Sequence, residues 1–143
     1  MDIRKIDDTI SVAPQISVDD VEEAAKLGFK TLVANRPDHE EPGQPAMADI
    51  EAAAREQGLE WVYMPVESGN ITDDDVNRFA PMIRDAEKPV LAFCRSGTRC
   101  TVLWALSAAR NTSANEIFTK ARNAGYDISG LAPRMAQQAA DKG

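Results

Sequence analysis

Stretches typical of β-strands alternate with stretches typical of amphipathic helices along this chain of 143 residues. Short apolar runs are each followed by a helical pattern of ten or more residues. The strand-like runs are residues 10–13, 30–34, 60–64 and 89–93, and the helical patterns cover residues 17–27, 45–57, 72–87, 100–110, 114–124 and 128–140. This order predicts βαβ units, and therefore an α/β fold with a mainly parallel central sheet of four to five strands and helices on both faces.

The length fits one domain, which we expect to cover residues 1–143. The first residues lack the apolar core of a signal peptide and no apolar run reaches the length of a membrane span, so we expect a cytoplasmic protein. Two closely spaced cysteines argue against a disulfide framework. The 23 acidic and 16 basic residues give a net charge of −7, which disfavours nucleic acid and anionic membranes as partners.

Three polar loops follow predicted strands, at residues 35–43, 65–71 and 94–99. In a parallel α/β sheet, ligands bind beyond the carboxyl ends of the strands. The sequence therefore predicts that these loops meet at one site.

The loop at residues 94–99 reads Cys-Arg-Ser-Gly-Thr-Arg, between the most apolar strand and a helix. Backbone amides curled around a centre, with the positive end of a helix dipole, bind anions, and Gly97 permits the turn. The same field, with Arg95 and Arg99, is expected to lower the pKa of Cys94 and hold it as a nucleophilic thiolate. The alternative is a buried, inert thiol, which the two arginines disfavour.

The predicted site follows from these loops. Its catalytic residues are Cys94 and Arg99, and its substrate-binding residues are Arg95, Ser96, Gly97, Thr98, Cys100 and Arg36. Cys100 is read either as a resolving thiol or as a small helix residue facing the core. Arg36 either approaches the anion or, as we favour, pairs with Asp38. The only histidine, His39, is expected to be solvated, and no metal or cofactor is predicted, since one histidine and two cysteines at this spacing make a poor zinc site.

The Cys94 loop resembles the active loop of single-domain rhodaneses, which have glycine three and arginine five positions after the cysteine. Over about residues 8–125 the chain resembles the bacterial family named for the phosphatase-like domain of beta-lactamase-hydrolase-like proteins, also labelled a sulfur transferase family. The matching segments are Asn-Arg-Pro-Asp at 35–38, Met-Pro-Val at 64–66 and the Cys94 loop. The resemblance implies a fold like that of dual-specificity (protein tyrosine) phosphatases. Relatives fused to a dioxygenase imply a persulfide dioxygenase as partner.

Two departures from the phosphatase signature bear on the reaction. Phe93 replaces its histidine, and Cys100 stands where its arginine belongs. Phosphoester cleavage also requires an acid for the leaving oxygen. The candidates are Glu67, Asp73, Asp74 and Asp75, of which the aspartates are read first as helix caps. Sulfur transfer requires no such acid, because a thiolate leaves unaided.

The sequence thus favours a sulfurtransferase, in which Cys94 takes sulfane sulfur from a small anionic thiosulfonate or persulfide donor and passes it to a thiol acceptor. One alternative is a cysteine-dependent phosphatase that acts on a phosphoester through a cysteinyl-phosphate. A second alternative is a thiol redox switch made of Cys94 and Cys100.

Overall fold

A five-stranded sheet lies at the centre of the molecule, in the strand order β1-β2-β5-β3-β4. The computed structural model describes residues 1–141, so the last two residues of the expected domain lie outside the described part. The strands are β1 (Arg4–Lys5), β2 (Ile10–Ala13), β3 (Thr31–Ala34), β4 (Glu60–Tyr63) and β5 (Val90–Phe93). All adjacent pairs are parallel except β1 with β2. The predicted α/β fold with a mainly parallel sheet is therefore confirmed.

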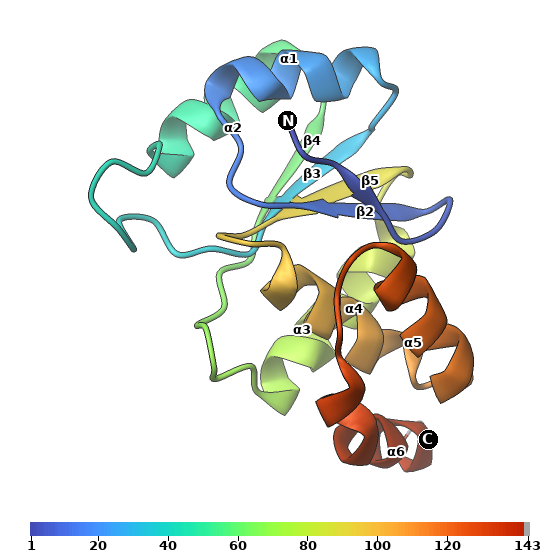
Figure 1. Cartoon of the computed structure of the whole chain (residues 1–143). Coiled ribbons are helices and arrows are strands. Elements are labelled where there is room, and N and C mark those ends of the chain that lie inside the picture. Colours follow the sequence, from blue (N-terminus) through green and yellow to red (C-terminus); the bar gives the residue numbers. More distant parts are fainter. Residues whose placement is uncertain (142–143) are drawn as a thin grey trace.

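The helices cover both faces of the sheet, as Figure 1 shows. One layer holds α1 (Val18–Lys26) and α2 (Met47–Glu56), and the other holds α3 (Asp73–Asp85), α4 (Thr98–Ala108), α5 (Ala114–Asn123), the short helix η1 (Ser129–Leu131) and α6 (Ala132–Ala140). Strand β5 lies between β2 and β3 and is buried on both sides. Its Leu91 and Phe93 pack under α1 and α2, whereas Val90 and Ala92 pack against the opposite layer.

Local signals set the helix starts. Ser17 and Thr72 each cap a helix through a reciprocal capping box, with Asp20 and Asp75 respectively. These contacts satisfy backbone amides that have no partner within the helix. The expected cap role of the aspartates after Thr72 is confirmed for Asp75.

Several expected bounds were wrong. Helix α4 begins at Thr98 rather than Cys100, because Gly97 takes a left-handed conformation (φ 89°) that starts the helix. The last helix is divided into η1 and α6, and the two-residue strand β1 is too short to leave a sequence pattern. The helix expected over residues 17–27 ends at Lys26, so Leu27 lies just beyond it and is exposed.

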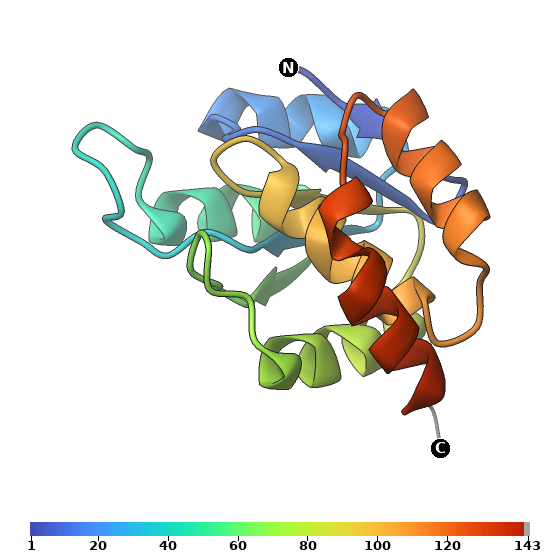
Figure 2. The ribbon, with the colours of Figure 1, turned by 60° about the horizontal axis from the view of Figure 1, so that its bottom comes forward.

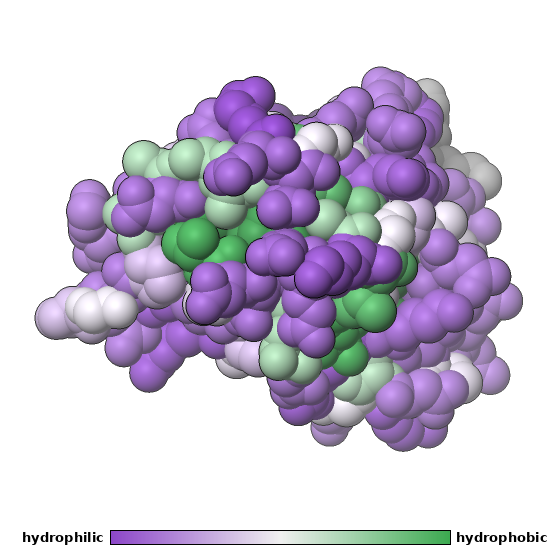
Figure 3. Space-filling view, turned by 90° about the horizontal axis from the view of Figure 1, so that it is seen from above, coloured by the Kyte–Doolittle hydropathy of each residue, from purple (hydrophilic) through white to green (hydrophobic). Residues whose placement is uncertain are grey.

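The three predicted loops meet at one edge of the sheet. Figures 1 and 2 show the segments after β3, β4 and β5 on the same side of the molecule, with the segment after β3 reaching furthest outward. The face that carries α1 and α2 is largely hydrophilic, with hydrophobic patches between its charged side chains (Figure 3). Within residues 1–141, the helices are all too short or too polar to cross a membrane.

Candidate active site

Cys94 follows the central strand β5 and is fully buried. The backbone N–H of Gly97 donates a hydrogen bond to its Sγ at 3.1 Å. The chain turns back at Gly97, whose positive φ is unfavourable for residues with a Cβ. Thr98 and Arg99, expected in the loop, form the first turn of α4 instead. The thiol thus lies between backbone amides and the start of a helix.

The pKa of Cys94 is lowered from 9.0 to about 6. The hydrogen bond from the Cys100 thiol is the main cause, and the amides of Cys100, Ser96 and Gly97 act in the same direction against the effect of burial. Burial and the neighbouring Cys94 raise the pKa of Cys100 well above 9.0, so Cys100 remains a thiol that donates to the Cys94 thiolate. A pKa lowered in this way favours the thiolate form of Cys94, and hydrogen bonds rather than arginine charges are its main cause.

Contacts from a distant segment hold the loop in place. Tyr126, which follows α5, donates from its hydroxyl to the carbonyl of Ser96 at 2.9 Å. A Cβ at residue 97 would collide with that hydroxyl, so glycine is required by contact as well as by its backbone conformation. The Thr101 hydroxyl donates to the carbonyl of Gly97 at 2.8 Å. The Cys94 loop is thus held by Tyr126 on one side and by α4 on the other.

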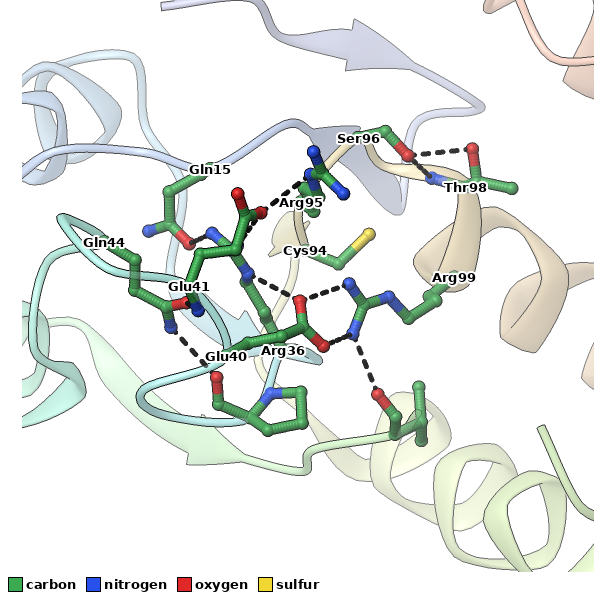
Figure 4. Close-up of polar contacts among 12 residues, drawn as sticks. Gln15, Arg36, Glu40, Glu41, Gln44, Cys94, Arg95, Ser96, Thr98 and Arg99 are labelled. Carbon is green, nitrogen blue, oxygen red and sulfur yellow. Dashed lines mark hydrogen bonds and ion pairs between the residues drawn. The ribbon is translucent and has the colours of Figure 1, made fainter. Parts of the chain in front are cut away.

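Arg99 is buried and forms a two-bond contact with the carboxylate of Glu40. Its two terminal nitrogens donate to the two oxygens of Glu40 at 2.8 and 2.7 Å, and one of them also donates to the Val66 carbonyl at 3.0 Å. Arg36 donates from Nε to the same carboxylate at 2.8 Å. Figure 4 shows Glu40 between the two guanidinium groups, close to Cys94. Arg99, and to a lesser degree Arg36, lower the pKa of Glu40 from 4.5 to about 2 against the effect of burial.

A second carboxylate, that of Glu41, pairs with both Arg36 and Arg95. It accepts from Arg36 at 2.6 Å and from Arg95 at 2.8 Å, and Arg36 also donates to Gln15 at 3.1 Å. The expected pairing of Arg36 with Asp38 was therefore wrong, because the loop brings Glu40 and Glu41 to a buried guanidinium. Arg95 is two-thirds exposed and points away from the buried thiol.

Two of the four expected acid candidates are engaged elsewhere, and the other two are exposed. The Asp75 carboxylate accepts from the Thr72 backbone N–H in the capping box of α3 and pairs with Arg78 at 2.6 Å. Asp73 pairs with Arg134 of α6 at 3.0 Å. Glu67 and Asp74 are exposed and do not line the cavity beside the Cys94 loop.

A cavity of about 590 Å³ opens beside the loop. The first turn of α4 and the loop after β4 form two of its walls, and η1 and α6 form the third. Of the predicted site residues, it is lined by Arg95, Ser96, Thr98 and Arg99. Cys94 belongs to the same loop but is fully buried and is not itself a lining residue of the cavity.

The structure thus gathers all eight predicted site residues around the Cys94 loop, with Arg36 held through the carboxylates rather than beside the thiol. Sequence reasoning missed Glu40, Glu41, Tyr126 and Arg134. The acidic pair stood in a loop already singled out, and its two carboxylates near Arg36 were an available signal. Tyr126 and Arg134 lie far from the Cys94 loop in the sequence, and no sequence signal pointed to them. Among residues 1–141 there is no group of three or more potential metal ligands.

The fold resembles solved structures of phosphatases. A candidate phosphatase from Neisseria meningitidis is 37% identical, with a TM-score of 0.85 over 96% of this chain and 99% of that one. The core catalytic domain of the PP-IP phosphatase of S. cerevisiae shares the fold, at 16% identity and a TM-score of 0.67, over 96% of this chain and 83% of that one. Sulfur transfer has no support in these matches, which agree better with the phosphatase alternative and with an enzyme of the hydrolase class.

Relatives by sequence point the same way. A beta-lactamase hydrolase-like protein of Agrobacterium fabrum is 30% identical over 138 residues, which are 95% of this chain and 32% of that protein. The chain thus spans about a third of the length of this relative, and a quarter of the similar protein of Xylella fastidiosa. Residues 2–111 match the family described as the phosphatase-like domain of beta-lactamase hydrolase-like protein, and the chain belongs to this family.

Proposed function

We propose that this domain is a cysteine-dependent phosphatase that hydrolyses phosphate monoesters through a cysteinyl-phosphate. The observation that carries the proposal is the two-bond contact between the Glu40 carboxylate and Arg99, which stands five residues along the chain from a cysteine whose Sγ accepts from the Gly97 amide. A carboxylate and two phosphate oxygens present similar geometry to a guanidinium. The contact with Glu40 therefore supports an oxyanion clamp at Arg99, although this arginine stands one position before that of the phosphatase signature.

In the first step, the phosphate displaces Glu40 and accepts hydrogen bonds from Arg99. The Cys94 thiolate attacks phosphorus, so an S–P bond forms as the ester P–O bond breaks. Amides of the loop stabilise the charge that develops on the equatorial oxygens. In the second step, water attacks phosphorus and the S–P bond breaks, which releases inorganic phosphate and a proton and restores the thiolate.

Protonation of the leaving oxygen determines which esters react fast. Asp75 serves as a helix cap and Asp73 is paired with Arg134, so solvent is the proton source in this proposal. Aryl phosphates, whose leaving oxygen is stable without a proton, should react much faster than alkyl phosphates. A flat dependence of kcat/KM, which reports the step that breaks the ester bond, on leaving-group pKa would show that a carboxyl group delivers the proton.

The test compares the wild type with Cys94→Ser on p-nitrophenyl phosphate and on thiosulfate with cyanide. Phosphate release that requires Cys94, with an added phosphoryl group on Cys94 in a rapidly quenched reaction, supports the proposal. A persulfide on Cys94 with turnover of thiosulfate alone would overturn it in favour of sulfur transfer. No turnover on either substrate, with a Cys94–Cys100 disulfide that forms readily, would favour the redox switch.

The remaining expectations concern the cell rather than the site. A cytoplasmic location and a persulfide dioxygenase partner stay predictions. The chain spans only about a third of the length of its Agrobacterium fabrum relative. Any activity of that longer protein likewise stays a prediction for this chain.

A further inference from the structure

The cavity beside the Cys94 loop carries a concentration of positive charge that the chain as a whole does not. The net charge of the protein is −7. Among the described residues that line the cavity, Arg95, Arg99 and Arg134 are cationic and none is acidic, and the carboxylates that pair with them, of Glu41, Glu40 and Asp73, lie outside that lining. A ligand anion can take the place of these carboxylates. A site with this local charge, in a protein that otherwise repels anions, favours an anionic ligand.

The three arginines reach the cavity from two different parts of the fold. Arg99 and Arg95 belong to the segment that carries Cys94, whereas Arg134 reaches the cavity from α6, 35 residues further along the chain. Arg134 donates to the Ile71 carbonyl at 2.9 Å and to Asp73 at 3.0 Å. These contacts use two of the five N–H donors of a guanidinium. The Asp73 side chain is 64% exposed, so a ligand can replace this surface partner at low cost.

The lining of the cavity is also partly apolar. Ile71, Val102 and Leu131 line it, each partly buried. A volume of about 590 Å³ is in the usual range for a small-molecule site. The cavity therefore suits a compact ligand with an apolar middle and an anionic group at each end.

We propose that the substrate is a small phosphate monoester whose leaving group carries a second anionic group, carboxylate or phosphate, bound by Arg134. The inference rests on the proposed phosphatase function and adds to it the class of substrate. Arg134 acts as a specificity residue at the end of the cavity away from the reacting phosphorus, and Asp73 competes with the second anion for it.

The test measures kcat/KM for phenyl phosphate, 4-carboxyphenyl phosphate and hydroquinone bisphosphate. The last two distinguish a carboxylate from a phosphate as the second group. We expect the wild type to prefer the doubly anionic esters by about tenfold, the factor that corresponds to about 1.4 kcal/mol from one charge-assisted contact. In Arg134→Gln, the ratio of kcat/KM between doubly and singly anionic esters should fall to about the ratio of their uncatalysed hydrolysis rates. In Asp73→Asn, this ratio should rise above that of the wild type. The ratio within each variant cancels any general loss of activity.

Arg110→Gln is the matched control. Arg110 also contacts α6, through Gln138 at 2.9 Å, but does not line the cavity. The Arg110→Gln variant loses the same charge and disturbs the same helix as Arg134→Gln. Its preference for doubly anionic esters should nevertheless match that of the wild type. Equal use of all three esters by the wild type, or a preference that persists in Arg134→Gln, would overturn the inference.

A binding measurement separates this inference from the proposed function. Phenylphosphonate and 4-carboxyphenylphosphonate cannot be hydrolysed, and calorimetry gives their affinities for the wild type and Arg134→Gln. If no ester is hydrolysed, the phosphatase proposal fails; tighter binding of the carboxylated phosphonate that depends on Arg134 still supports a site for two anions. Equal binding of both phosphonates by the wild type would refute the site for a second anion, whether or not the protein hydrolyses phosphate esters.

Discussion

Replacing Glu40 with glutamine should weaken the fold and strengthen anion binding at the same time. The carboxylate joins two buried guanidinium groups, of Arg99 and Arg36, and its pKa is lowered from 4.5 to about 2. That lowering corresponds to at most about 3.4 kcal/mol. The side chain is a quarter exposed, so solvent screening reduces the expected loss in Glu40→Gln to about 1–2 kcal/mol. The same change frees Arg99, and we expect inorganic phosphate to bind about tenfold more tightly.

The pH dependence provides a check on the sign. A carboxyl group whose pKa is lower in the folded protein stabilises it above its ordinary pKa and loses that effect as the pH falls. The wild type should therefore lose its advantage over Glu40→Gln between about pH 4.5 and pH 2. Urea unfolding at pH 7, 5 and 3 and phosphate titration at pH 7 measure both effects. Glu51→Gln, which breaks an exposed pair with Arg55, is the control and should cost under about 0.5 kcal/mol. If Glu40→Gln matches this control in both measurements, Glu40 does not restrain Arg99.

Three further outcomes follow from the loop itself. The rate of Cys94 alkylation by iodoacetamide should rise with pH through a midpoint near 6, and a midpoint near 9 would contradict a stabilised thiolate. Cys100→Ala should move that midpoint up by about one unit, because it removes the thiol that donates to Cys94, whereas Cys100→Ser retains a donor and should move it less. Gly97→Ala should cost about 1–3 kcal/mol in urea unfolding, from its positive φ and the collision with Tyr126; a cost below about 0.5 kcal/mol would show that the loop relaxes freely.

The sequence predicted the fold well, because its signals are local. Apolar runs of four or five residues, separated by capped amphipathic helices, identify four of the five strands within a residue or two. The capping box at Thr72 is readable from residue types alone. The start of α4 was placed too late, because the left-handed turn at Gly97 initiates a helix without a capping side chain.

The site was predicted only in part, since its electrostatics depend on contacts between distant residues. The pattern around Cys94 identifies the nucleophile, but not that Glu40, 59 residues from Arg99, holds this arginine. The chemistry favoured from the missing signature arginine, sulfur transfer, is not supported by the phosphatase relatives. Arg99 stands one position before the arginine of the phosphatase signature. Spacing along the chain does not reveal that it still forms a two-bond contact with an oxyanion.

The position of β5 in the sheet affects how the protein is assembled during synthesis. The central strand is the last of the five to leave the ribosome, and Val90 pairs with Ile10 on one side and Thr31 on the other. Until it emerges, β2 and the β3–β4 pair have no common partner, and their inner edges are open to other chains. Insertion of β5 closes this gap and places the Cys94 loop at the edge of the completed sheet. Because the Cys94 loop directly follows β5, we expect it to be held in place only once the sheet is complete.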